Sequence, residues 1–211
     1  MTVKAEDMVR AVRVAIDMNR EDTSLLDDGD ADTLDLDTII YAKLADAVRM
    51  VETEAPAIML ESGHDFGNNY VFLGEDGKGF IVLPHDFMRL IAFRMSDWER
   101  TVFDAITESD PEYALQSSRF KGICGNPEKP VVAIVRRSEG KVLEFYSCRD
   151  NQARVTQATY LPIPKIDMDG GIDVAEDCYR AAVYRAASLA LASVGDQLST
   201  TMLEISKSLL Q

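Results

Sequence analysis

Two short aspartate repeats are the residues of this chain whose spacing best suits metal chemistry. Asp28-x-Asp30-x-Asp32 resembles the start of a calcium loop, which also needs glycine at its sixth position and glutamate at its twelfth. Thr33 and Ile39 occupy those positions. The second repeat, Asp167-x-Asp169-Gly170, has Cys178 at its twelfth position. We therefore interpret both repeats as solvated turns and predict no metal site and no cofactor.

Residues for acid–base or nucleophilic catalysis are sparse. The chain has two histidines, and neither stands in a catalytic motif: His64 has Asp65 beside it in a glycine-bounded loop, and His85 follows a proline. There is no G-x-S-x-G elbow, and Gly122-Ile123-Cys124-Gly125 lacks the Lys-Ser or Lys-Thr of a phosphate-binding loop. Carboxylates are abundant, but nothing singles out a pair for glycoside chemistry. We predict no catalytic residues.

The three cysteines are Cys124, Cys148 and Cys178. They are far apart, odd in number and form no C-x-x-C pair, so they predict free thiols in a reducing compartment. The chain also lacks the hydrophobic segment of a signal peptide or a membrane span.

The net charge of −14 comes from 36 acidic and 22 basic residues. Binding to nucleic acid phosphates needs a basic face, and the longest basic cluster is Arg136-Arg137. Sequence-specific binding to DNA or RNA is therefore not expected. Two interpretations of the acidic surface stay open: it provides solubility, or it lines a pore through which DNA slides without sticking.

Helical periodicity occupies both ends of the chain. Residues 5–19 and 37–53 each place an apolar stripe on one face, with an acid-rich, exposed linker at 20–35 between them. Pro56 marks the end of the second helix. The segment 173–209 is rich in alanine at helical spacing, and Gly195 either separates two helices or kinks one.

The middle of the chain has the short, turn-bounded apolar runs of strands. We predict strands at 69–73, 79–83, 88–95, 101–105, 131–136, 142–147 and 155–161, with a short helix or turn at 111–117. Pro84 should end one strand and form a corner with the next, because proline cannot donate to a strand ladder. We assign four nearby aromatic residues to the core: Phe87, Phe93, Trp98 and Phe103.

These elements predict an α+β fold. We expect a helical bundle of residues 1–60 and 170–211, with an inserted antiparallel β-sandwich or partial barrel at 61–169.

Several segments resemble those of one protein family. Leu83-Pro84, the run Asp86–Leu90 and the later Trp98 are similar to a strand corner in the head-to-tail adaptor proteins of tailed bacteriophages. The segments Leu36–Ile40 and Ala55-Pro56 resemble the second helix of such adaptors, especially the ring proteins of crAss-like and other Bacteroidetes phages. The helical C-terminal segment resembles their C-terminal helices, so the resemblance covers about residues 4–210.

The resemblance implies a structural virion protein rather than an enzyme. It implies a homo-oligomeric ring, commonly a dodecamer, docked beneath the portal protein and followed by the next tail or ring protein. The helical part would form much of the ring and of the channel through which DNA passes. The subunit would be made in the bacterial host cytoplasm and end in the virion. The alternative is a soluble enzyme or small-ligand-binding domain of unknown chemistry.

The resemblance also implies that the C-terminal segment contacts the portal. An apolar stripe lies there at helical spacing, formed by Leu198, Met202, Ile205 and Leu209. Such a stripe can pack within the subunit or dock as a helix into a partner's groove. We expect that removing residues 197–211 leaves a folded protein that no longer joins the portal or the ring.

Overall fold

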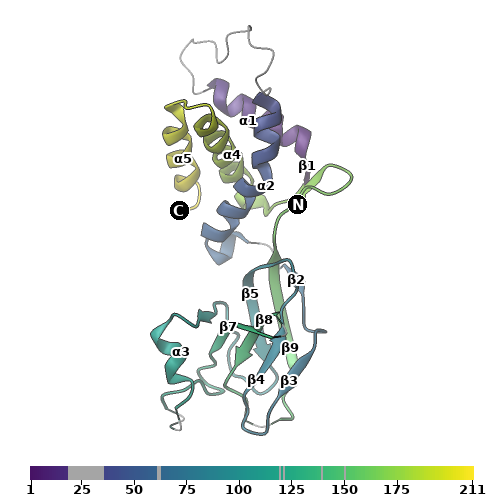
Figure 1. The fold of residues 1–211 in the computed structure, drawn as a ribbon, viewed down its shortest axis with the longest axis vertical. Coiled ribbons are helices and arrows are strands. Elements are labelled where there is room, and N and C mark those ends of the chain that lie inside the picture. Colours follow the sequence, from purple (N-terminus) through teal and green to yellow (C-terminus); the bar gives the residue numbers. More distant parts are fainter. Residues whose placement is uncertain (19–35, 61–62, 119, 121, 139, 150) are drawn as a thin grey trace. The chain divides into compact units, whose positions relative to one another are not determined.

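The computed structural model describes residues 1–18, 36–60, 63–118, 120, 122–138, 140–149 and 151–211 (Figure 1). The predicted exposed linker at 20–35, with Asp28, Asp30 and Asp32, lies outside these residues. The chain forms two compact units, a helical unit of Met1–Glu61 with Pro164–Gln211 and a β domain of Ser62–Ile163. The sequence analysis placed the second boundary later, between residues 169 and 170.

The described residues of the helical unit form four longer helices, which are α1 (Ala5–Met18), α2 (Leu36–Glu54), α4 (Tyr179–Ser193) and α5 (Leu198–Ser208). Two short 3-10 helices, η1 (Ala57–Met59) and η2 (Glu176–Cys178), follow α2 and precede α4. The predicted helices at both ends of the chain are thereby confirmed.

Apolar stripes bring these helices together. Met8, Val12 and Ile16 of α1 and Ile40, Leu44, Val48 and Val51 of α2 are buried in one core. The buried alanines of α4, among them Ala182, Ala186 and Ala190, belong to the same core, and small side chains allow neighbouring helices to approach closely. Gly195 separates α4 from α5: its φ of 75° is left-handed, which glycine adopts without strain.

One predicted helical boundary is wrong. Residues 171–173 form strand β10 (Gly171–Asp173), which pairs antiparallel with β1 (Thr2–Lys4), so the C-terminal helices begin only at Tyr179 after η2. Three-residue strands are too short to give a recognisable alternation, and their pairing joins opposite ends of the sequence.

The β domain contains two sheets. The three-stranded sheet has the order β2 (His64–Asp65), β9 (Val155–Pro162), β5 (Phe87–Met95). The five-stranded sheet has the order β3 (Val71–Leu73), β4 (Gly79–Val82), β8 (Gly140–Phe145), β7 (Val132–Arg137), β6 (Ile106–Thr107). A short helix, α3 (Pro111–Leu115), follows β6.

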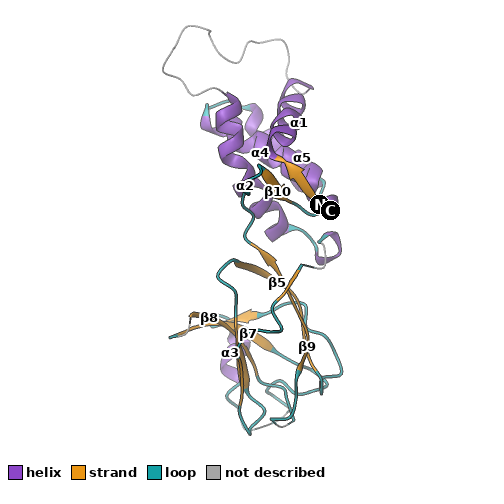
Figure 2. Cartoon of the chain, turned by 90° about the vertical axis from the view of Figure 1, so that its right-hand side faces the viewer, coloured by secondary structure: helices purple, strands orange, loops and turns teal. Residues whose placement is uncertain are grey.

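The two sheets form a sandwich around a common core (Figure 2). Phe93 and Tyr160 enter this core from the three-stranded sheet, and Leu143 and Phe145 enter it from the five-stranded sheet. Strand β4 ends at Val82, just before Pro84, and the chain then crosses to the other sheet as β5. The predicted corner at this proline and the predicted sandwich are thus both observed.

Three details of the β domain differ from the prediction. Residues 101–105 form no strand and contribute a single bridge from Val102 to Phe93, and the following β6 is parallel to β7. Phe103 is 62% exposed, while Phe87, Phe93 and Trp98 are buried as expected. Val102 and Ala105 of the same run still pack against the β-domain core, so Phe103 alone of its apolar residues is exposed. The predicted loop residue His64 belongs to β2.

None of the helices among the described residues combines the length and the apolar character that a membrane span requires.

Candidate functional site

The predicted contact stripe lies on α5 and on Leu209 just after it, and it packs against the core of the helical unit. Met202 has no exposed surface, and Leu198 and Leu209 are partly buried against the same helical core. Ile205 is half-buried. Most of the apolar area of the stripe is therefore used inside the helical unit, and its contact with a portal or ring neighbour stays a prediction.

Hydrogen bonds also attach α5 to α4. The Ser206 hydroxyl donates to the Ala181 carbonyl oxygen, and the Ser188 hydroxyl donates to that of Ser199, both at 2.8 Å. Ser206 is fully buried, so these contacts belong to the packed interior. A partner can reach α5 only on its outward face, without Met202.

The second aspartate repeat forms a tight turn before β10. The Asp167 carboxylate accepts hydrogen bonds from the backbone N–H groups of Asp169 and Gly171, at 2.9 and 2.6 Å. These bonds satisfy the carboxylate locally, as in an Asx turn. Among the described residues, no group of three or more histidine, cysteine or acidic side chains is placed to hold a metal ion.

The remaining residues considered for chemistry lie apart. His64 and His85 are both exposed, and His64 makes an edge contact with the Tyr160 ring at 5.9 Å between centroids. Cys124, Cys148 and Cys178 all keep their thiols, as predicted, and the last two are buried.

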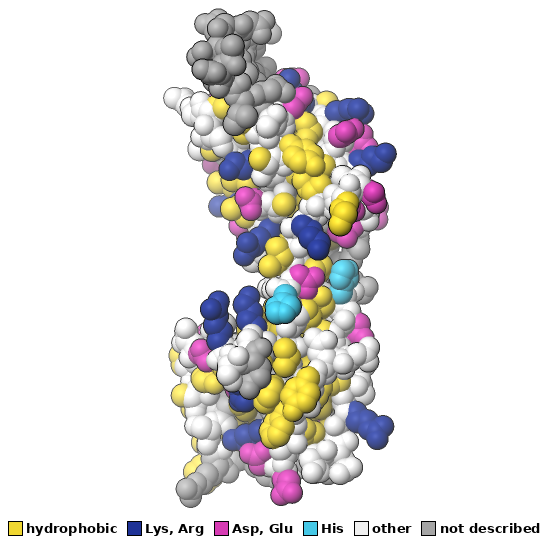
Figure 3. Space-filling model, turned by 45° about the vertical axis from the view of Figure 1, so that its right-hand side comes forward, with side chains coloured by type: hydrophobic (Ala, Val, Ile, Leu, Met, Phe, Trp, Pro, Cys, Tyr) yellow, Lys and Arg dark blue, Asp and Glu magenta, His cyan; other side chains and the backbone are white. Residues whose placement is uncertain are grey.

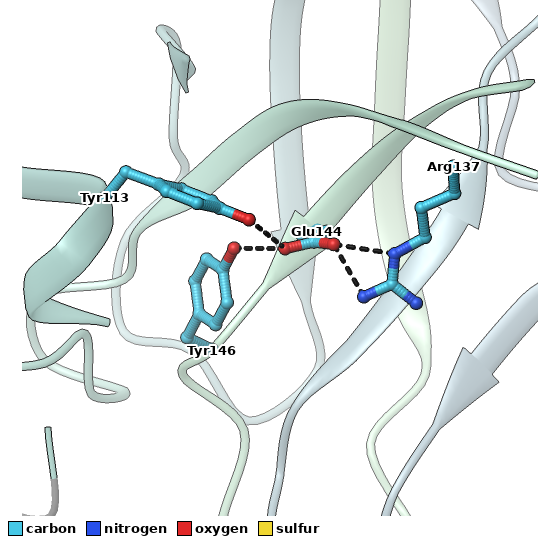
Figure 4. A network of polar contacts seen from close by, with 4 residues as sticks. All are labelled: Tyr113, Arg137, Glu144 and Tyr146. Atoms are coloured by element: carbon cyan, nitrogen blue, oxygen red, sulfur yellow. Dashed lines mark hydrogen bonds and ion pairs between the residues drawn. The ribbon is translucent and has the colours of Figure 1, made fainter. Parts of the chain in front are cut away.

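The most developed polar cluster surrounds Glu144 on β8 (Figure 4). Glu144 is only 5% exposed, and its carboxylate accepts hydrogen bonds from Tyr113 of α3 at 3.4 Å and from Tyr146 at a shorter distance. Arg137 of β7 forms an ion pair with the other oxygen, with Nε at 2.7 Å and Nη2 at 2.5 Å. Arg137 and Glu144 lie on the same face of neighbouring strands, but Glu144 is opposite Ala133 and Arg137 is opposite Gly140, so the long arginine side chain reaches back along the strand to the carboxylate.

The two phenols of the cluster do not ionise near neutral pH. Burial, and then the bond to Glu144 and its negative charge, raises the pKa of Tyr146, while burial and Glu144 also raise the pKa of Tyr113. Both phenols therefore stay protonated near neutral pH and act as donors. Because Tyr113 is the contribution of α3, the cluster fixes this helix over one half of the sheet.

The other half of that sheet face carries an aromatic patch formed by Tyr70, Phe72 and Phe80. The Phe72 and Phe80 rings stack with centroids 5.6 Å apart, and Tyr70 lies 6.3 Å from Phe80. The Arg137 guanidinium sits over the Phe80 ring at 4.6 Å. Tyr70 is 66% and Phe72 is 49% exposed, so the patch is accessible within the β domain. Apolar side chains also reach the surface of the β domain in Figure 3.

Sequence reasoning missed both the Glu144 cluster and the aromatic patch. A signal was present for each: Glu144 interrupts the apolar run Val142–Phe145, and Tyr70 and Phe72 alternate with residues that face the core. The alternation gives the face, but only the sheet order shows that Phe72 and Phe80 are neighbours.

Comparisons with known proteins assign no family to this chain: no protein-family model matches its sequence, and no curated protein matches it significantly.

Proposed function

We propose that this chain is a head-to-tail adaptor, a ring subunit of the connector between the portal and the tail of a tailed bacteriophage or prophage. The observation that carries the proposal is the order of its elements. A β-sandwich is inserted after the second helix of a helical unit whose last two helices follow the insertion. This is the order of helices and strands in the adaptors that the sequence resembles.

The distribution of charge supports the proposal. Residues 62–163 carry 14 acidic and 12 basic residues, whereas the remainder carries 22 acidic and 10 basic residues, of which 7 acidic and 1 basic residue lie at 19–35, outside the described residues. The described residues of the helical unit still carry more net negative charge than the β domain, and the resemblance assigns this unit to the ring and channel. A negative channel wall repels DNA phosphates and lets the duplex move through.

Exposed apolar side chains on both units give further support, because a ring subunit must bury surface against neighbours. On the helical unit Ile58 is almost fully exposed and Val14 is mostly exposed, and the β domain carries the aromatic patch. In this proposal the helical unit makes the ring and the β domain faces the next tail or ring protein.

Particle size tests the proposal. The purified 23.4 kDa chain, alone and mixed with the portal protein of the same genome, is measured by mass photometry and imaged by negative-stain electron microscopy. We expect annular particles of many subunits, alone or on the portal. A chain that stays monomeric or dimeric under both conditions contradicts the proposal and favours the alternative of a soluble enzyme or ligand-binding domain.

A further inference from the structure

Strand β3 forms one end of the five-stranded sheet. It pairs with β4 on one side, and no strand among the described residues pairs with its other side. In Figure 1 it lies at the margin of the β domain. An edge strand presents a row of backbone donors and acceptors to any strand that can align with it.

The ladder shows which backbone groups of β3 point outward. Val82 N–H donates to the Tyr70 carbonyl oxygen and Gly74 N–H donates to that of Lys78, while Phe72 is opposite Phe80. In an antiparallel ladder, bonded pairs alternate with non-bonded pairs. The backbone groups of Phe72 therefore face β4, and those of Val71 and Leu73 face the free edge.

We infer that this edge pairs with the β3 strand of a second copy of the chain, antiparallel and centred on Phe72. In that register Val71 is opposite Leu73 of the partner copy, and both have outward-facing backbone groups. Two such pairs give four backbone hydrogen bonds across the two-fold axis. Phe72 faces its own counterpart as a non-bonded pair, the type in which side chains lie closest.

The side chains around β3 are complementary to themselves in this register. The exposed Phe72 rings meet at the axis, and Phe80 extends the aromatic row on each side. Tyr70 is opposite Gly74, which leaves room for its ring. Beyond the strand, uncharged Asn68 and Asn69 face Asp76 and Glu75, so like charges do not oppose one another. A second copy thus satisfies the edge and covers the aromatic patch at the same time.

This pairing goes beyond the proposed ring and does not rest on it. A two-fold contact joins copies in pairs, whereas a ring closes through head-to-tail contacts. Loss of the pairing therefore leaves the particle-size test of the adaptor proposal unaffected.

Cysteine cross-linking tests the register in the full-length chain. The substitution Phe72→Cys is made together with Cys124→Ser, because Cys124 is the partly exposed native thiol. Non-bonded antiparallel partners have Cα atoms about 4.5 Å apart, within the range of about 4.4–6.8 Å that a disulfide spans. We expect rapid formation of a disulfide-linked dimer. The matched control is Phe103→Cys in the same background, at a more exposed position that belongs to neither regular ladder.

Sedimentation gives an independent measurement on the chain without introduced cysteines. The wild type should show a concentration-dependent dimer, and Phe72→Asn should weaken dimerisation by roughly a hundredfold, since two buried phenylalanine rings are lost. Far-UV circular dichroism checks that the variant folds. If the wild type stays monomeric and Phe72→Cys cross-links no faster than Phe103→Cys, the inference is wrong, and a strand of another protein becomes the occupant to seek.

Discussion

The surroundings of Glu144 constrain its substitution. It is a buried carboxylate that binds one guanidinium and two phenols, so removing it leaves three donors without their acceptor. We expect Glu144→Ala to lower the free energy of unfolding by about 1–3 kcal/mol, the range for hydrogen bonds to a charged group, because Arg137 is partly solvated.

Urea denaturation followed by circular dichroism measures this change. Glu128→Ala is the matched control, since Glu128 is exposed, and it should change stability by less than about 0.5 kcal/mol. An equal effect of the two substitutions would show that the Glu144 cluster does not stabilise the β domain.

Tyr160 provides a prediction about pH. Burial, together with the hydrogen bond that its hydroxyl donates to Asp86 at 2.9 Å, raises the pKa of Tyr160 to about 12. The unfolded chain ionises this phenol near its ordinary value of about 10. The contribution of Tyr160 is thus fully present below pH 10 and is lost as the pH rises towards 12.

A phenolate absorbance titration tests the cause. Asp86→Asn should lower the pKa of Tyr160 without restoring the ordinary value, because burial remains. Comparison with Tyr160→Phe identifies which part of the titration curve belongs to Tyr160. An unchanged titration curve in Asp86→Asn would show that the carboxylate has no part in the shift.

At the scale of single residues, the sequence predicted types of surroundings better than contacts. The burial of Phe93 and Trp98 follows from the ordinary preference of aromatic residues for the core, and it is observed. The Glu144 cluster combines side chains from α3, β7 and β8, so it exists only once the register of the sheet is set. Phe103 is a large apolar residue of the kind found in cores, but it is exposed.

Helix α5 is the element for which the structure changes the expectation most. Met202 is fully buried in the helical core, and Leu210 is nearly so. We now expect removal of residues 197–211 to destabilise the helical unit rather than to leave it intact. Met202→Ala alone should cost about 2–5 kcal/mol of unfolding free energy, as deletions of buried side chains do.

Thermal unfolding measured by circular dichroism tests this expectation for α5. Thr201→Ala is the control, one residue away on the exposed face. If the truncated chain is as stable as the full chain, α5 does not stabilise the helical unit, and the original prediction of a docking helix is favoured. Portal docking itself is better tested with Ile205→Asp, which leaves Met202 in place.

Elements with clear periodicity were predictable, and those defined by distant pairing were not. The stripes of α1 and α2 repeat over several turns, and the β3–β4 and β7–β8 hairpins are bounded by glycine-containing turns. Strands β1, β6 and β10 have three residues or fewer, and each exists because of a partner elsewhere in the chain. The sequence around a short strand does not indicate which distant segment will pair with it.

For the whole molecule, the boundaries between the two compact units also separate the strongly acidic part of the sequence from the nearly neutral part. The sequence of the helical unit holds almost all of the net negative charge. Each unit also has its own hydrophobic core, and the β domain has a second, smaller apolar cluster besides. Units that differ in net charge and have separate cores are suited to contact different partners. Separate cores are also expected when one domain is inserted into a loop of another.

The β domain should therefore fold when excised as residues 62–163. Its ends lie side by side, because His64 of β2 is paired with Tyr160 of β9, so excision separates no paired strand from its partner. The domain retains its complete core and both sheets. Trp98, the only tryptophan of the chain, is 2% exposed in that core and reports on it directly.

We expect the excised domain to show the blue-shifted tryptophan emission of the full chain and a cooperative urea transition in which Trp98 becomes solvated. The matched partner is the helical unit with residues 62–163 replaced by a short Gly-Ser linker, followed by its helical circular dichroism. Both pieces should unfold cooperatively, because each buries its own apolar side chains. Solvent-exposed tryptophan emission from the excised domain without denaturant would mean that the sandwich depends on the helical unit, and that the two units fold as one.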